Sequence, residues 1–142
     1  MLSVNAGEEL RPLSKVASGG EISRIMLGIK TITADTDNIQ TLVFDEIDTG
    51  ISGRIAGIVG EEMRNISRSR QVICVTHQPQ IAALADAHFL IEKYQDENHT
   101  NINIRLLNSA ERVREVARIM SGNEKSSSAL EHARELLLRG KN

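Results

Sequence analysis

The chain has 142 residues, 40% of them hydrophobic, which is enough for one domain with its own core. Its formal net charge is −2 at pH 7 and its aromatic residues are two Phe and one Tyr. Neither a basic field nor a stacking platform therefore indicates direct nucleic-acid binding. No apolar stretch approaches membrane-spanning length and no signal peptide is recognisable. The single cysteine fits a reducing compartment, so we expect a cytoplasmic protein without a membrane partner.

The first strong pattern along the chain is the beginning of a helix. Residues 2–6 are predicted as the tail of a strand and residues 7–16 as a polar loop. Apolar residues then recur at helical spacing over residues 22–32. Ser18 and Glu21 form the S-x-x-E pattern of a capping box, which predicts that the helix begins here.

Two consecutive glycines, Gly19 and Gly20, lie inside the capping box and are not explained by it. Each glycine costs about 1 kcal/mol in a helix relative to alanine. Without a Cβ atom, they allow another backbone segment or a phosphate group to approach the free amides at the positive helix end. The hydroxyl of Ser18 adds one more donor. The sequence therefore predicts an anion-binding helix start.

Residues 41–46 (Thr-Leu-Val-Phe-Asp-Glu) combine an apolar run with two adjacent carboxylates. The run predicts a strand over residues 40–45 that is buried on both faces, as in a parallel sheet. Its acids lie at the carboxyl end, where open α/β sheets place their ligand crevice. Asp45 suits a Mg²⁺ site because Mg²⁺ prefers hard oxygen ligands, and Glu46 could polarise an attacking water. The alternative is a strand that merely ends in solvated acids.

A second strand is predicted over residues 71–76, after an amphipathic helix over residues 51–67. His77 follows this strand, and Pro79 suits the first turn of a helix that runs through residue 85. A lone histidine after a strand is usually a structural group. Because the carboxyl ends of neighbouring parallel strands meet at one edge, this histidine is also a candidate to lie beside the two acids.

The rest of the chain predicts an antiparallel pair and two helices. Strands over residues 88–94 and 100–107 flank a polar turn at 95–99. A helix over residues 109–120 has Ser109 as a possible cap and ends at a glycine, and a last helix covers residues 126–138. We therefore expect an α/β fold whose largely parallel sheet is flanked by helices and has a small antiparallel edge.

The order of these motifs resembles the head of an ABC-type ATPase. The resemblance assigns residues 18–21 to the signature motif, and Asp45 and Glu46 to the Walker B acids. Asp48 corresponds to the D-loop residue and His77 to the switch histidine. Each motif alone is weak evidence, whereas four motifs in the right order are strong evidence.

Longer stretches resemble the RecN family of SMC-like bacterial DNA-repair proteins over nearly the whole chain. These stretches are DEIDTGISGR, VTHQPQIAALAD and ALEHARELL. No G-x-x-x-x-G-K-[ST] motif is present, and in RecN-like proteins this P-loop lies in an amino-terminal segment beyond a coiled-coil arm. The resemblance implies that residues 1–142 are the carboxyl-terminal part of an ATPase head, inactive until completed by that amino-terminal head segment.

The resemblance also implies a mechanism in which two dimerised heads sandwich ATP and Mg²⁺. Asp45 would help hold the metal, Glu46 would orient the attacking water, and His77 would reach the γ-phosphate from the same head. The cofactor-binding residues supplied by the opposite head would be Ser18, Gly19, Gly20, Glu21 and Asp48. ATP hydrolysis would then drive engagement of DNA in double-strand-break repair and recombination near the bacterial nucleoid.

Two other functions are compatible with parts of the sequence. One is a non-catalytic lobe that dimerises or bridges DNA and binds no nucleotide. The presence of Ser18, Glu46 and His77 together argues against it, because such a lobe needs none of them. The other is the nucleotide-binding domain of an ABC transporter. Two features disfavour a transporter domain. The residues that follow the Asp-Glu pair differ from those usual in transporters, and position 21 is Glu where transporters often have Gln.

Overall fold

The computed structural model describes residues 12, 17–33, 38–95, 100–123 and 126–140. The chain forms two compact units, Met1–His77 and Gln78–Asn142, which we describe separately as unit 1 and unit 2. The strand tail expected over residues 2–6 lies outside the described residues. Most of the loop expected over residues 7–16 and most of the turn expected over residues 95–99 lie outside them as well.

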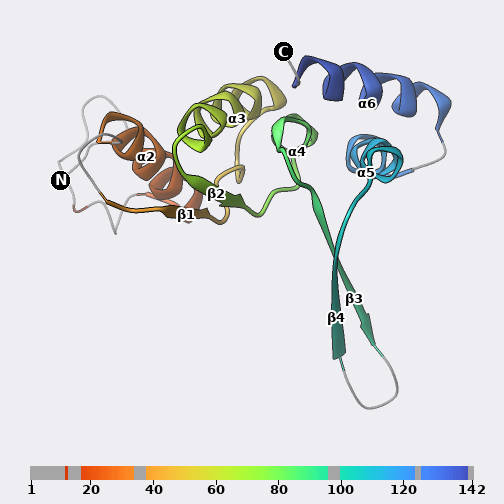
Figure 1. Ribbon diagram of the computed structural model, residues 1–142, viewed down its shortest axis with the longest axis horizontal. Helices are drawn as coiled ribbons and strands as arrows, with labels where there is room; N and C mark the ends of the chain where they lie inside the picture. Colours follow the sequence, from red (N-terminus) through yellow and green to blue (C-terminus); the bar gives the residue numbers. More distant parts are fainter. Residues whose placement is uncertain (1–11, 13–16, 34–37, 96–99, 124–125, 141–142) are drawn as a thin grey trace. The chain divides into compact units, whose positions relative to one another are not determined.

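Unit 1 is a small α/β layer in which two strands pair in parallel. Helix α2 (Gly19–Ile32) precedes strand β1 (Thr41–Phe44), and helix α3 (Gly53–Ser67) connects β1 to strand β2 (Gln71–Cys74). Both helices lie on one side of the strand pair (Figure 1). The buried apolar residues of unit 1 come from both helices, from β1 and from the turn after β1: Leu27, Leu42, Phe44, Ile47, Ala56, Val59, Met63 and Ile66.

The expectation that the first strand is buried on both faces is wrong. Along β1, Leu42 and Phe44 are buried, whereas the Val43 side chain between them is 66% exposed. Ile73, its partner in the register of β2, is 45% exposed. The helices α2 and α3 cover only one face, so the continuous apolar run predicts more burial than the described part of this chain supplies.

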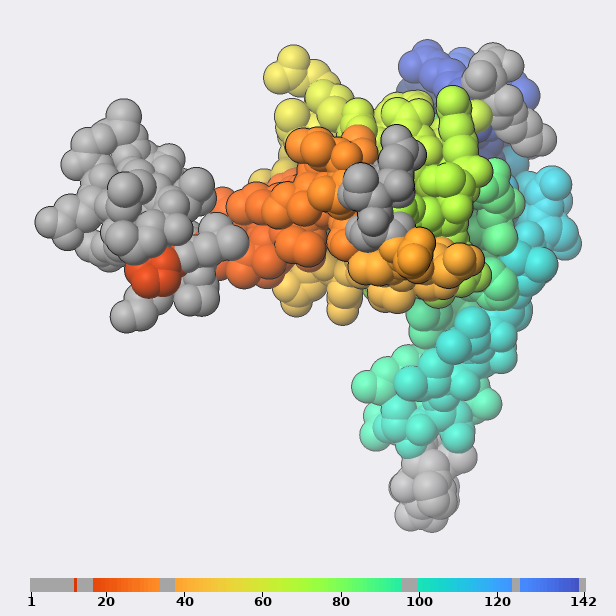
Figure 2. Space-filling model, turned by 60° about the vertical axis from the view of Figure 1, so that its left-hand side comes forward, coloured from red at the N-terminus to blue at the C-terminus, as the bar shows by residue number. Residues whose placement is uncertain are grey.

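Unit 2 combines a hairpin with three helices. Helix α4 (Pro79–Leu84) and strands β3 (Phe89–Gln95) and β4 (Thr100–Leu106) precede helices α5 (Ser109–Ser121) and α6 (Ser127–Arg139). The three helices share an apolar cluster formed by Ala82, Val116, Ala117, Ala129 and Ala133. The antiparallel hairpin extends away from α5 and α6 (Figures 1 and 2).

The helix ends follow the predicted signals with one exception. Ser18 and Glu21 form the expected capping box at α2, and Pro79 is in the first turn of α4. Gly122 ends α5 in the left-handed conformation, at φ 71°. The cap of α5 is Asn108 rather than Ser109, because the Asn108 side chain accepts hydrogen bonds from the amides of residues 110 and 111.

The α/β class is confirmed, although the sheet arrangement is simpler than expected. Within the described ranges, β1–β2 and β3–β4 are two separate two-stranded sheets, so the antiparallel pair is not an edge of the parallel one. Among the helices of these ranges, none is both long and apolar enough to cross a bilayer.

Candidate functional site

The two predicted Walker B acids lie in a tight turn that follows β1. Asp45 and Glu46 are both exposed, and Asp45 Oδ1 accepts a hydrogen bond from the Glu46 amide at 2.9 Å. Glu46 has a φ of 57°, and its carbonyl accepts from the Thr49 amide at 3.0 Å. A left-handed conformation is uncommon for a residue with a Cβ atom and often occurs where function requires it. The turn leaves both carboxylates open to a ligand.

Helix α2 packs its first turns directly on this loop. The Ser23 hydroxyl donates to the Asp45 carbonyl at 2.9 Å. Arg24 Nη1 donates to the carbonyls of Ile47 at 2.9 Å and Thr49 at 3.0 Å. Because these acceptors are main-chain groups, α2 fixes the path of the loop that carries the acids. Sequence reasoning missed Ser23 and Arg24, and no local pattern could reveal contacts across more than 20 residues.

The two glycines of α2 permit this packing. A Cβ atom at Gly20 would lie 2.8 Å from the Glu46 carbonyl oxygen. A Cβ atom at Gly19 would collide with the Glu46 carboxylate, at Oε2. Of the two approaches that the sequence left open, another backbone or a phosphate, the structure contains the backbone approach. The start of α2 and the acids after β1 therefore lie together in one packed arrangement.

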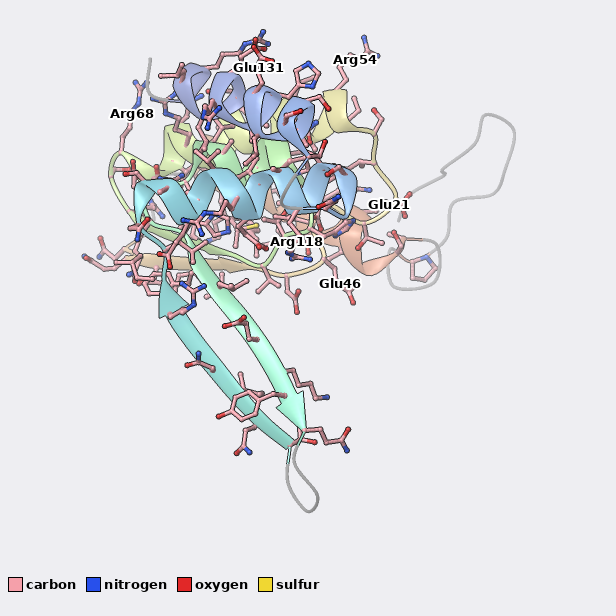
Figure 3. All side chains as sticks on the ribbon, turned by 90° about the vertical axis from the view of Figure 1, so that its right-hand side faces the viewer. Glu21, Glu46, Arg54, Arg68, Arg118 and Glu131 are labelled. Atoms are coloured by element: carbon pink, nitrogen blue, oxygen red, sulfur yellow. The ribbon has the colours of Figure 1, made fainter. Side chains whose placement is uncertain are left out.

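The capping box orders the start of α2 and holds Glu21 in its ionised form. Glu21 Oε2 accepts from the Ser18 amide at 2.7 Å and from its hydroxyl at 3.0 Å. The backbone hydrogen bond, then the hydroxyl bond and the charge of Arg24, lower the pKa of Glu21. In Figure 3, the Glu46 side chain points outward from the loop, and Glu21 lies near it at the helix start.

His77 is held beside the same loop by a buried carboxylate. Asp48 Oδ2 accepts hydrogen bonds from the Thr76 hydroxyl at 2.5 Å and the His77 amide at 2.8 Å. His77 Nδ1 lies 3.1 Å from the same oxygen, and the imidazole is 71% exposed while the Asp48 side chain is 3% exposed. The structure therefore brings His77 to the loop of Asp45 and Glu46, as the parallel strands predicted. Thr76 was missed as a site residue.

Cys74, the last residue of β2, has an environment that disfavours its thiolate form. Burial, followed by the charges of Asp48 and Asp45, raises its pKa to about 12. The thiol is half-buried, rather than a full core group. It is accordingly no candidate nucleophile.

A metal ion held here would need ligands beyond the protein side chains of the site. Over the described ranges, no group of three or more His, Cys, Asp or Glu residues is placed to hold a metal. Mg²⁺ normally binds one or two carboxylates and completes its shell with phosphate oxygens and water. The exposed Asp45 fits that requirement, so the residues present are compatible with magnesium bound together with a nucleotide.

Comparison with known proteins shows what this chain is similar to. No protein-family model matches the chain. The DNA repair protein RecN of Deinococcus radiodurans is 52% identical over 136 residues, which cover 95% of this chain and 23% of that protein. RecN of Halalkalibacterium halodurans is 48% identical over 96% of this chain, and RecN of Treponema pallidum is 47% identical over 99%. Over nearly its whole length, the chain is similar to RecN.

The RecN resemblance predicted from the sequence is thus confirmed. The chain spans about a quarter of the length of these RecN proteins, 24% of the H. halodurans and T. pallidum proteins. A solved SMC ATPase structure matches with a TM-score of 0.53 at 16% identity, covering 82% of this chain and 69% of that one. This likeness shows that the chain shares the fold of an SMC ATPase head.

Proposed function

We propose that this RecN segment supplies one part of an ATP hydrolysis site that two heads share in a DNA repair protein. The observation that carries the proposal is the convergence of three segments in unit 1. The start of α2 contacts the Glu46 loop after β1, and that loop holds His77 after β2. A signature motif, two adjacent acids and a histidine are therefore parts of one packed arrangement.

Each exposed group has a chemical task that suits its place. Asp45 would hold magnesium, which supplies charge neutralisation to the phosphates when bound. Glu46 would orient a water molecule and accept its proton as a general base. His77, whose Nδ1 lies beside Asp48, would reach the γ-phosphate with its exposed imidazole edge. Because phosphoryl transfer depends on positioning and charge stabilisation, these tasks require few groups in fixed places.

The site is incomplete within this segment, and other parts of the protein complete it. The sequence has no P-loop lysine, so the amino-terminal head segment of the same protein would cradle the phosphates. The exposed Ser18 and Gly19 at the start of α2, with Gly20 and Glu21 behind them, would cap the γ-phosphate held by a second head. Closing of the two heads would control DNA engagement in double-strand-break repair, in the cytoplasm near the nucleoid.

A mixed-dimer experiment tests this shared site in the full-length protein. Ser18→Arg and Glu46→Gln homodimers should each be nearly inactive, because both of their sites carry the same defect. A mixed dimer has one doubly damaged site and one intact site. It should recover up to about half of the wild-type ATPase activity if the sites act independently. If Ser18 served the nucleotide of its own head, every site would keep one defect and mixing would recover nothing.

Two controls make the result interpretable. Ser126→Arg places the same substitution at the serine cap of α6, outside the site, and should leave the activity unchanged. Wild-type/Glu46→Gln mixed dimers must form, bind ATP and remain active, which shows that one damaged site does not silence the other. Inactive Ser18→Arg/Glu46→Gln dimers in the presence of these positive controls would contradict the proposal.

A further inference from the structure

We infer that Asp48 is a positioning residue for His77 of the same molecule, and does not reach across the interface to a second head. The inference rests on the proposed function and concerns one residue of that site. In the family resemblance, the position of Asp48 implies a role toward the opposite head. The structure gives it a different environment, because its side chain is buried and its Oδ2 atom is engaged within unit 1.

Two hydrogen-bond donors and one ring nitrogen converge on a single oxygen of Asp48. The Thr76 hydroxyl, the His77 amide and His77 Nδ1 lie 2.5, 2.8 and 3.1 Å from Oδ2. A carboxylate with 3% of its side chain exposed is stable only when it is hydrogen-bonded in this way. If Asp48 turned outward to another molecule, the amide of His77 and the hydroxyl of Thr76 would each lose this acceptor. The buried arrangement therefore opposes a role in contact with the second head.

The contact with Nδ1 has a chemical consequence for His77. A carboxylate oxygen offers only lone pairs, so its approach to within 3.1 Å of Nδ1 favours the tautomer that carries its proton on Nδ1. The side chain as a whole is 71% exposed, and the other ring nitrogen, Nε2, is the one left to meet a ligand. A carboxylate beside one ring nitrogen thus favours one tautomer and one ring orientation. Without Asp48, this exposed imidazole would rotate freely.

The geometry also couples the histidine to the catalytic acids. Asp48 lies three residues after Asp45 in the same loop, and that loop is fixed by the bonds from α2. The Val75 amide donates to the Phe44 carbonyl at 3.0 Å, which continues the strand pairing up to the residues before His77. Asp48 therefore links the loop of the acids to the end of β2. Its carboxylate sets where His77 stands relative to Asp45.

The first test measures the tautomer directly in full-length RecN. Nitrogen NMR of histidine-labelled protein, with His77 assigned by the loss of its signals in His77→Gln, should show the Nδ1–H form in the wild type. Asp48→Asn should shift His77 toward the Nε2–H form that free histidine prefers. Asp86→Asn makes the same chemical change at an exposed carboxylate and should leave the spectrum unchanged. An unchanged His77 tautomer in Asp48→Asn would overturn the inference.

The kinetic effects of substitutions should also show that Asp48 positions His77 and does not bind ATP itself. Asp48→Asn should lower kcat by about 10–100-fold, as removal of a group that orients a ligand commonly does, with ATP affinity little changed. Thr76→Val removes one donor to Asp48 and leaves the contact between Asp48 and His77, so its effect should be smaller. Thr76→Ser keeps the hydroxyl and should restore most of the activity.

A second mixed-dimer experiment separates a role in the same molecule from a role across the interface. When Ser18→Arg is mixed with Asp48→Asn, one site keeps an intact Asp48–His77 pair and an intact signature from its partner, so activity should recover. If Asp48 acted across the interface, it would serve the same site as Ser18 of its own head. Both sites would then remain damaged, and mixing would recover nothing.

The outcomes for this inference and for the proposed function are distinguishable. Recovery with Ser18→Arg/Glu46→Gln but not with Ser18→Arg/Asp48→Asn would overturn the role of Asp48 and leave the shared site standing. No recovery with either pair, or no ATPase activity in the wild type, would overturn the shared site itself and this inference with it. Recovery with both pairs, together with the tautomer shift, is the expected result.

Discussion

The main-chain carbonyl oxygen of Glu46 lies 2.8 Å from the point that a Cβ atom at Gly20 would occupy. The Thr49 carbonyl oxygen is only 3.1 Å from the same point. Both neighbours are backbone atoms of the loop that carries the acids, so they cannot move without displacing the loop. The glycine therefore determines how closely α2 approaches the site.

We predict that Gly20→Ala destabilises full-length RecN by about 1–3 kcal/mol, the usual cost of overpacking. At Gly19 the obstacle is the tip of the flexible Glu46 side chain, so Gly19→Ala should cost little stability and should instead displace Glu46 and slow hydrolysis. Gly28→Ala is the matched control, because a Cβ atom there meets nothing within 4 Å and alanine favours the helix by about 1 kcal/mol. Chemical denaturation and ATPase rates check all three variants. Equal stability of Gly20→Ala and Gly28→Ala would contradict the close packing.

The second prediction concerns the role of Glu46 as a general base. Glu46→Gln in the full-length protein should slow ATP hydrolysis by about 10²–10⁴-fold. ATP binding should persist because Asp45 and the phosphate contacts remain, so the heads should accumulate as a closed, ATP-bound dimer detectable by sedimentation. Glu61→Gln, an exposed carboxylate on α3, is the matched control and should behave like the wild type. Hydrolysis at the normal rate by Glu46→Gln would exclude it as the base.

Local contacts in this chain could be predicted from the sequence, and distant ones could not. The Ser18–Glu21 capping box links positions three residues apart, so both partners of its hydrogen bonds lie within one four-residue sequence pattern. The bond from Thr76 to Asp48 joins positions 28 residues apart, and no periodicity encodes such a pair. The sequence therefore identified Asp48 and His77 separately, as motif residues, and missed that one holds the other.

The strands illustrate a different limit. The apolar run at 41–44 correctly predicted strand β1 and the α/β class. It also predicted burial on both faces, which depends on what covers the strand. Val43 is exposed because the described helices of this segment lie on one face only, and the matched RecN proteins are about four times as long. The apolar composition of a strand reflects everything that packs on it in the whole protein, and this segment contains only part of that protein.

The third prediction is that Cys74 resists alkylation. With its pKa raised to about 12 by burial and by the charges of Asp48 and Asp45, the fraction of thiolate at pH 8 should be far below that of an ordinary thiol. Since the acid form is favoured, the alkylation rate should keep rising about tenfold per pH unit through pH 10, without levelling off near 9. Mass spectrometry of the Cys74 peptide after timed iodoacetamide treatment measures this rate. A plateau near pH 9 would show an ordinary thiol.

The fourth prediction is that the isolated segment binds ATP only weakly and does not hydrolyse it. The sequence has no P-loop. The backbone amides and the lysine that a P-loop supplies are therefore missing, and nothing offsets the repulsion between a triphosphate and the carboxylates of Asp45 and Glu46. Isothermal titration calorimetry of the segment should give no micromolar affinity, whereas full-length RecN should bind under the same conditions. Micromolar binding by the isolated segment would mean that its own residues form a complete phosphate site.

The last prediction concerns the uncovered face of the parallel sheet. Three apolar side chains, Val43, Ile73 and Val75, are 66%, 45% and 52% exposed, and Val43 and Ile73 are partners in the strand register. Contiguous exposed apolar groups on a sheet commonly mark an interface. The paired strands also have open edges that can recruit further strands. We expect the amino-terminal head segment of RecN to cover this face.

The isolated segment should therefore self-associate at micromolar concentrations, and co-expression with the rest of RecN should abolish that association. The Val43→Thr/Ile73→Thr double variant keeps β-branched side chains, so the strands should persist while self-association and binding of a hydrophobic dye decrease. Ile58→Thr changes a 57% exposed isoleucine on α3 and is the matched control, which should associate like the wild type. Sedimentation velocity measures the association. If the unmodified segment sediments as a sharp monomer and binds no dye, this face is not an interface. An apolar interface that has lost its partner should either self-associate or bind the dye.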